Sequence, residues 1–80
     1  MIEGAQMVRV TWHDAHSASH WQEVSDIDAD PYVVETVGWL LPGTKPDHVV
    51  IAQSVGSDDS VDGIISIPVG IVVALKLLGS

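Results

Sequence analysis

The stretch from Thr11 to Trp21 holds most of the side chains that can carry out specific chemistry. It contains two of the three tryptophans and three of the four histidines of the chain, together with Asp14, Ser17 and Ser19. Imidazole and carboxylate groups are ligands for zinc, nickel and iron. Serine, histidine and aspartate also form hydrolytic triads. This stretch is therefore the first candidate for a functional site.

Two catalytic interpretations of the stretch lack a specific spacing. The histidines and Asp14 are suitable metal ligands, but their spacing matches no established signature. On a strand, His13 and Asp14 would point to opposite faces, so only a loop could gather them. A triad using Ser17 or Ser19 would draw all its members from one short stretch, whereas most triads draw on separated elements. We predict a non-enzymatic protein without a cofactor, with a metal-dependent hydrolase as an alternative.

The length and composition of the chain favour assembly. Its 80 residues make one domain near the lower limit for a single core. There is no cysteine, which excludes disulfides and thiolate metal sites. A core of this size stabilises a fold by only about 3–5 kcal/mol, while 46% of the residues are hydrophobic. We therefore predict a homo-oligomer that buries surface between subunits, and a compact monomer is the alternative.

The charge balance restricts the partners. Eleven acidic residues against Arg9, Lys45 and Lys76 give a net charge of −8. Duplex nucleic acid is bound mainly through lysine and arginine side chains that neutralise phosphates, so we predict no duplex partner. A small nucleotide remains compatible, because backbone amides, hydroxyls and aromatic faces can hold it. An acidic surface also suits a basic protein partner.

The sequence predicts a protein of the cytoplasm with no membrane segment. The longest apolar run, residues 64–78, is interrupted by Ser66, Pro68, Gly70 and Lys76, and it is shorter than the roughly 20 residues that a spanning helix needs. The first residues have neither the basic nor the apolar region of a signal peptide. We expect residues 1–6 to be a flexible lead and residues 7–80 to be a single small β domain.

Hydrophobic periodicity predicts five short strands, at about residues 7–12, 33–41, 47–54, 62–67 and 71–78. A Ser-x-x-Gln capping pattern predicts a short helical turn at 19–25, in the long loop after the first strand. Gly38 inside the second strand predicts a bend, a bulge or a close approach of another backbone. The predicted fold is all-β, either a strongly bent five-stranded sheet or a small SH3-like or Sm-like barrel.

The tryptophans divide by their position on the strands. Trp12 lies on the apolar face of the first strand and Trp39 shares its parity with Val37 and Leu41, which predicts that both belong to the core. Trp21, in the polar loop, is open between the core, a subunit interface and stacking on a ligand. The predicted ligand-binding residues are Arg9, Trp12, His13, Asp14, Ser17, His20, Trp21, Thr36, Gln53 and Ser54.

Several short motifs resemble those of a group of small proteins common in phage and prophage genomes. They are Val10-Thr11-Trp12-His13-Asp14-Ala15, Trp21, Thr36-Val37-Gly38-Trp39-Leu40, Val50-Ile51-Ala52-Gln53-Ser54 and Ile67-Pro68-x-Gly70-Ile71, and the resemblance covers about residues 8–78. It implies a non-virion accessory protein made in the infected bacterium. Small oligomeric phage proteins of this size include the viral sponges, which sequester nucleotide signals of bacterial immunity such as cyclic dinucleotides. The likeness is one of fold and context.

Three functions follow as hypotheses. The first is a non-enzymatic oligomer that binds and sequesters a small nucleotide signal in the cytoplasm of the host. The second is an acidic interaction module that inhibits a host protein. The third is the metal-dependent hydrolase built on the histidine cluster.

Overall fold

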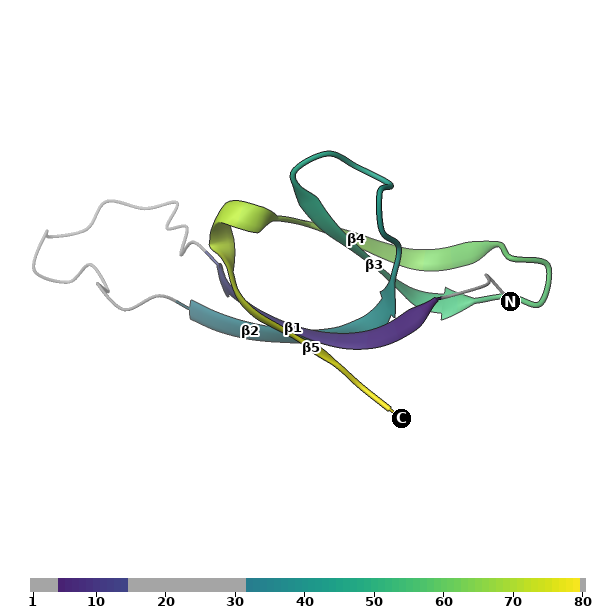
Figure 1. Cartoon of the computed structure of the whole chain (residues 1–80), viewed down its shortest axis with the longest axis horizontal. Helices are drawn as coiled ribbons and strands as arrows, with labels where there is room; N and C mark the ends of the chain where they lie inside the picture. Colours follow the sequence, from purple (N-terminus) through teal and green to yellow (C-terminus); the bar gives the residue numbers. More distant parts are fainter. Residues whose placement is uncertain (1–4, 15–31, 80) are drawn as a thin grey trace, which may run out of the picture.

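The computed structural model describes residues 5–14 and 32–79. Their five strands are β1 (Gln6–Asp14), β2 (Tyr32–Leu40), β3 (His48–Val55), β4 (Val61–Pro68) and β5 (Val72–Leu77). All pairings are antiparallel, and they join the strands into one sheet of order β4-β3-β2-β1-β5 (Figure 1). The predicted all-β fold is confirmed. The helical turn predicted at 19–25 lies outside the described residues.

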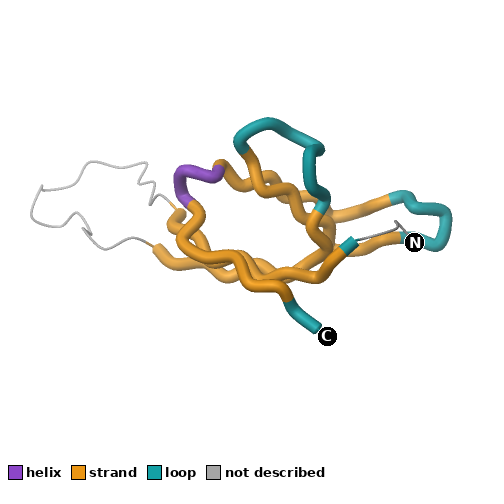
Figure 2. Tube along the Cα trace, viewed as in Figure 1, coloured by secondary structure: helices purple, strands orange, loops and turns teal. Residues whose placement is uncertain are grey.

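Each predicted strand has its counterpart in the structure, with ends that differ by one or two residues. Pro68 is the last residue of β4, as expected of a residue that has no N–H to donate to a ladder. The 3₁₀ helix η2 (Val69–Ile71) then turns the chain into β5 (Figure 2). Val72 and Val73 begin β5, and β-branched residues of this kind favour a strand over a helix.

The sheet folds over itself at the end of β2. β1 pairs with β2 along its whole length, whereas only Trp39 and Leu40 of β2 pair with β3. As a result β3 and β4 lie across from β1, β2 and β5 (Figure 1). The sheet stays open, with β4 and β5 as its two edges. Of the two predicted forms, the structure has the strongly bent sheet.

Gly38 makes this fold-over possible. A Cβ atom at Gly38 would contact the Cγ2 methyl of Ile51 and lie 2.7 Å from the carbonyl oxygen of Ala52. Real Cβ atoms do not come so close to another backbone, so only glycine lets β3 cross β2 at this point. The close backbone approach predicted at Gly38 is confirmed.

The core lies between the two parts of the folded sheet. Val8 and Val10 of β1, Ile51 of β3 and Ile67 of β4 form its fully buried cluster. Removing a side chain of this size from water stabilises the fold by about 1.5–3 kcal/mol. Trp12 packs against the cluster, which confirms its predicted place with the apolar face of β1. Further partly buried side chains cover the cluster, namely Leu40, Val49, Ile65 and Val72.

The inward face of β2 is opposite to the predicted one. Gly38 is the register partner of the buried Val8, and directly opposed residues share a face of the sheet. The alternating positions therefore point outward, and Val37 is 54% exposed. Trp39 is only half-buried on this outer face, so its predicted place in the core is wrong. The reason is steric. Ile51 fills the space on the inward side of β2 beside Gly38, so this side has no room for the indole of Trp39.

The turn between β3 and β4 is held by local hydrogen bonds. The Gly56 N–H donates to the Ser60 carbonyl at 2.7 Å, and the Asp59 N–H donates to the Gly56 carbonyl at 3.0 Å. The Ser60 hydroxyl also donates to the Asp58 carboxylate at 2.6 Å. This hydroxyl, together with the Ser60 N–H, lowers the pKa of Asp58 below its ordinary value. Asp58 is therefore part of a structural turn.

Candidate ligand-binding site

The predicted ligand-binding residues do not form one site in the described part of the chain. Ser17, His20 and Trp21 lie outside the described residues. The remaining seven lie at four separate places. Arg9 and His13 are on the outer face of β1, and Trp12 is on its inner face with Thr36 of β2. Asp14 is the last residue of β1, and Gln53 and Ser54 lie near the end of β3.

Trp12 and Thr36 are joined across the inner face of the sheet. The Trp12 indole N–H donates to the Thr36 hydroxyl oxygen at 3.0 Å in a partly buried position. Buried indole N–H groups usually find a partner of this kind. The contact therefore gives both residues a structural role, in which Thr36 satisfies the polar end of a side chain that packs on the core.

We expect Thr36→Val to lower the free energy of unfolding by about 1–2 kcal/mol, because it leaves the partly buried Trp12 N–H without an acceptor. Urea unfolding followed by circular dichroism measures the change. Thr11→Val is the matched control, since Thr11 points to the outer face of β1, and it should change stability by less than about 0.5 kcal/mol. Equal losses in the two variants would mean that the hydrogen bond is not the cause.

Gln53 and Ser54 lie away from the end of β1 that carries His13 and Asp14. They occupy the part of β3 that leads into the β3–β4 turn, at the opposite end of the sheet from Asp14 (Figure 1). Both side chains are exposed. The Gln53 side chain lies over Gly63, where an added Cβ would be 2.7 Å from its Oε1 atom. These two residues cannot meet His13 and Asp14 around one small ligand.

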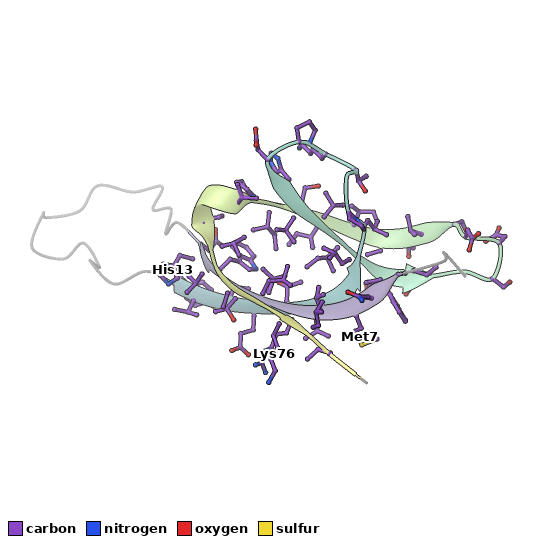
Figure 3. All side chains as sticks on the ribbon, viewed as in Figure 1. Met7, His13 and Lys76 are labelled. Atoms are coloured by element: carbon purple, nitrogen blue, oxygen red, sulfur yellow. The ribbon has the colours of Figure 1, made fainter. Side chains whose placement is uncertain are left out.

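A second group of side chains does come together, on the outer face of β1, β2 and β5. Trp39 of β2 is the register partner of Met7, and Arg9 is the register partner of both Val37 and Lys76. Met7 and Lys76 both project from the outer side of the sheet (Figure 3). Their strands therefore place an aromatic ring, a thioether and two cations on one surface.

A hollow of about 440 Å³ lies beside Trp39, at the end of the sheet where β1 begins. Its walls come from the start of β1, the end of β2, and the end of β5 with the two residues that follow it. The lining residues are Ala5, Gln6, Met7, Trp39, Leu77, Leu78 and Gly79. Apart from Gln6 these side chains are apolar, so the hollow suits a flat apolar group that stacks on the indole.

Arg9 and Lys76 lie next to the hollow as a pair of like charges. They are directly opposed across β1 and β5, an arrangement that destabilises a sheet by a few tenths of a kcal/mol or more. Glu35 is diagonal to Arg9 in the β1–β2 register. Among the described residues neither cation forms an ion pair. Two of the three basic side chains of an acidic chain thus lie side by side, with no ion pair to either of them within residues 5–14 and 32–79.

We define Trp39, Met7, Leu78, Arg9 and Lys76 as the outer-face site. Arg9 belonged to the predicted ligand-binding set, while Trp39 and Lys76 did not. The signal for Trp39 was its position next to Gly38, since a glycine that admits another strand turns its neighbour outward. The signal for Lys76 was its parity with Leu78, the residue that follows β5.

Residues 5–14 and 32–79 contain no group of three histidine, aspartate or glutamate side chains that could hold a metal ion. His16 and His20 of the predicted cluster lie outside these ranges. In the described part of the chain, no helix has the length and apolar character needed to cross a membrane. A comparison of the chain with protein-family models, with curated proteins and with solved structures finds no match.

Proposed function

We propose that this protein binds a small nucleotide at the outer-face site without transforming it. One observation carries the proposal: Met7 and Trp39 line the hollow, and the next outward positions along β1 and β5 carry the cations Arg9 and Lys76. Stacking of a base on an aromatic ring stabilises a complex by about 1–3 kcal/mol, and adjacent cations bind phosphate through charge-assisted hydrogen bonds.

The spacing of the site suits a nucleotide. Met7, at the hollow, and Arg9 are successive outward residues of β1, so about 7 Å separates them along the strand. A sugar can span this distance between a stacked base and its phosphate. Lys76, opposite Arg9, extends the anion-binding part across to β5.

The net charge of −8 is compatible with a bound phosphate. Charges more than about 8–10 Å away are largely screened at physiological ionic strength. A single phosphate at this position therefore interacts chiefly with the two adjacent cations and with Glu35, which is diagonal to Arg9. A long polyanion would extend beyond them onto acidic surface, which supports a small ligand over duplex nucleic acid.

Binding without turnover fits the side chains of the site. Indole, thioether, aliphatic, guanidinium and ammonium groups stabilise an anion and a ring, and the site as defined has no carboxylate, imidazole or hydroxyl to act as a general base. The resemblance of the sequence to phage accessory proteins supports sequestration of a nucleotide signal in the cytoplasm of an infected bacterium as the biological role.

Isothermal titration calorimetry with a panel of linear and cyclic nucleotides tests the proposal. We expect at least one nucleotide to bind, and Trp39→Leu to weaken its binding about 5- to 150-fold, as the loss of 1–3 kcal/mol of stacking implies. Arg9→Gln and Lys76→Gln should each weaken binding and reduce its dependence on salt concentration.

Lys45→Gln is the matched control, because Lys45 is the third basic residue and lies exposed in the turn before β3. It should leave the affinity unchanged. Thermal unfolding of each variant separates a loss of binding from a loss of structure. The absence of binding heat across the whole panel would refute the proposal, and so would an equal effect of all three charge substitutions.

A further inference from the structure

The free edge of β5 has the features of a pairing surface for a second copy of this chain. Within residues 5–14 and 32–79, β5 is an end strand of the sheet and pairs with β1 on one side only. We propose that two copies join their β5 strands antiparallel about a twofold axis at Leu75. The result is a continuous sheet that runs through both molecules.

The hydrogen-bond pattern identifies which groups of β5 are free. The Leu78 N–H donates to the Met7 carbonyl of β1 at 2.8 Å. In an antiparallel ladder, alternate residues direct their N–H and C=O groups to the same neighbour. Lys76 and Ala74 therefore bond to β1, whereas Leu75 and Leu77 direct their N–H and C=O groups toward the open side.

The same residues leave apolar side chains uncovered. Val73, Leu75 and Leu77 are 57%, 41% and 55% exposed. Such an edge, rich in valine and leucine with one lysine, is an open template for another strand. The backbone groups and the side chains thus point to the same segment of β5.

Self-pairing centred on Leu75 matches both the free backbone groups and the exposed apolar side chains of the two strands. It opposes Leu75 to Leu75 of the second copy, and Leu77 to Val73, the bulged residue of the β1–β5 register. Lys76 then faces Ala74, so the two lysines are not opposed. Centring the pair on Lys76 would oppose two like charges, which is unfavourable. The register at Leu75 is therefore the preferred one.

The other edge of the sheet is protected against pairing. In β4, Gly63 has a φ of +69°, a left-handed conformation that interrupts a regular edge. Pro68 removes one donor, and the exposed Asp62 adds a charge. β5 has only Lys76 and its single bulge. The contrast between the two edges singles out β5 as the place where a second copy binds.

A cysteine cross-link tests this arrangement without any nucleotide. The chain has no cysteine, so Leu75→Cys introduces a single thiol. In the proposed pair the two Cα atoms are about 5.5 Å apart, within the range that a disulfide bridges. We expect mild oxidation to convert most of this variant into a covalent dimer on a non-reducing gel.

Val69→Cys is the matched control, because Val69 is 52% exposed in η2, which precedes β5, and is not one of the residues that the proposed strand pair opposes. It should give at most a minor dimer band at the same concentration. The unmodified protein should show a concentration-dependent mass between one and two chains in sedimentation, and Leu75→Lys should shift it to one chain. A Leu75→Cys protein that stays monomeric, equal cross-linking of both cysteine variants, or a monomeric unmodified protein at millimolar concentration would each overturn the proposal.

Discussion

Gly38→Val is expected to abolish folding. A side chain at this position would collide with the Ile51 methyl group and the Ala52 carbonyl oxygen, where β3 crosses β2. Neither can yield easily, because Ile51 and Ala52 are fully buried. A domain of this size has only about 3–5 kcal/mol of net stability. An added side chain in a packed core typically costs about 1–3 kcal/mol, and the additional clash with the backbone of Ala52 raises the cost to about the whole net stability. Circular dichroism and thermal unfolding should show no cooperative transition.

Gly70→Ala is the matched control for this substitution. A Cβ at Gly70 would meet no atom within 4 Å, and its φ lies outside the left-handed region. The variant should keep the native stability or gain up to about 1 kcal/mol from a less flexible unfolded chain. A Gly38→Val protein with an unchanged melting temperature would show that the close approach of β3 to β2 does not hold the bend.

Ile51→Ala is expected to lower the free energy of unfolding by about 2–5 kcal/mol, through lost burial and the cavity that remains. Ile51 is 1% exposed and belongs to the central cluster with Val8, Val10 and Ile67. A loss in the upper part of this range would remove the whole net stability of about 3–5 kcal/mol. Chemical denaturation measures the loss. A variant that is already unfolded would show no unfolding transition.

Ile64→Ala removes the same atoms from the neighbouring strand β4, where Ile64 is 49% exposed. It should cost no more than about 1 kcal/mol, because half of that side chain already contacts water. The comparison isolates burial from residue type. Similar losses in the two variants would contradict the assignment of the core to the inner face of β3.

The sequence was sufficient to predict the strands and the bend. Strict alternation in β1, with Val8, Val10 and Trp12 on one face, identified both a strand and its buried side. Gly38 inside an apolar strand indicated a close backbone approach, and the structure shows it against Ile51 and Ala52. Local patterns succeed here because each depends on the geometry of one strand and its nearest neighbours.

The buried face of β2 could not be predicted in the same way. Both parities of this strand are apolar, with Val37 and Trp39 on one and Val34 and Leu40 on the other. Alternation alone cannot choose between two such faces. The choice depends on β3, which packs against the face that carries Gly38, and this contact is long-range.

The outer-face site could be identified only once the buried face of β2 was known. The sequence drew attention to the histidine-rich stretch and to Arg9, whereas Trp39 and Lys76 became candidates only once their faces were known. Lys76 meets Arg9 because β5 pairs with β1, far away in the sequence. No spacing motif encodes such a pair, since the two residues belong to the first and last strands.

The unequal edges of the sheet determine the kind of assembly that this chain can build. Joining β5 to β5 is an isologous contact, so it consumes both open edges at once. Only the two β4 edges remain, each interrupted at Gly63 and Pro68. In the proposed arrangement, growth therefore ends at a closed pair. A chain of this fold with both edges open would instead join β4 to β5 head to tail, and it would extend into a filament.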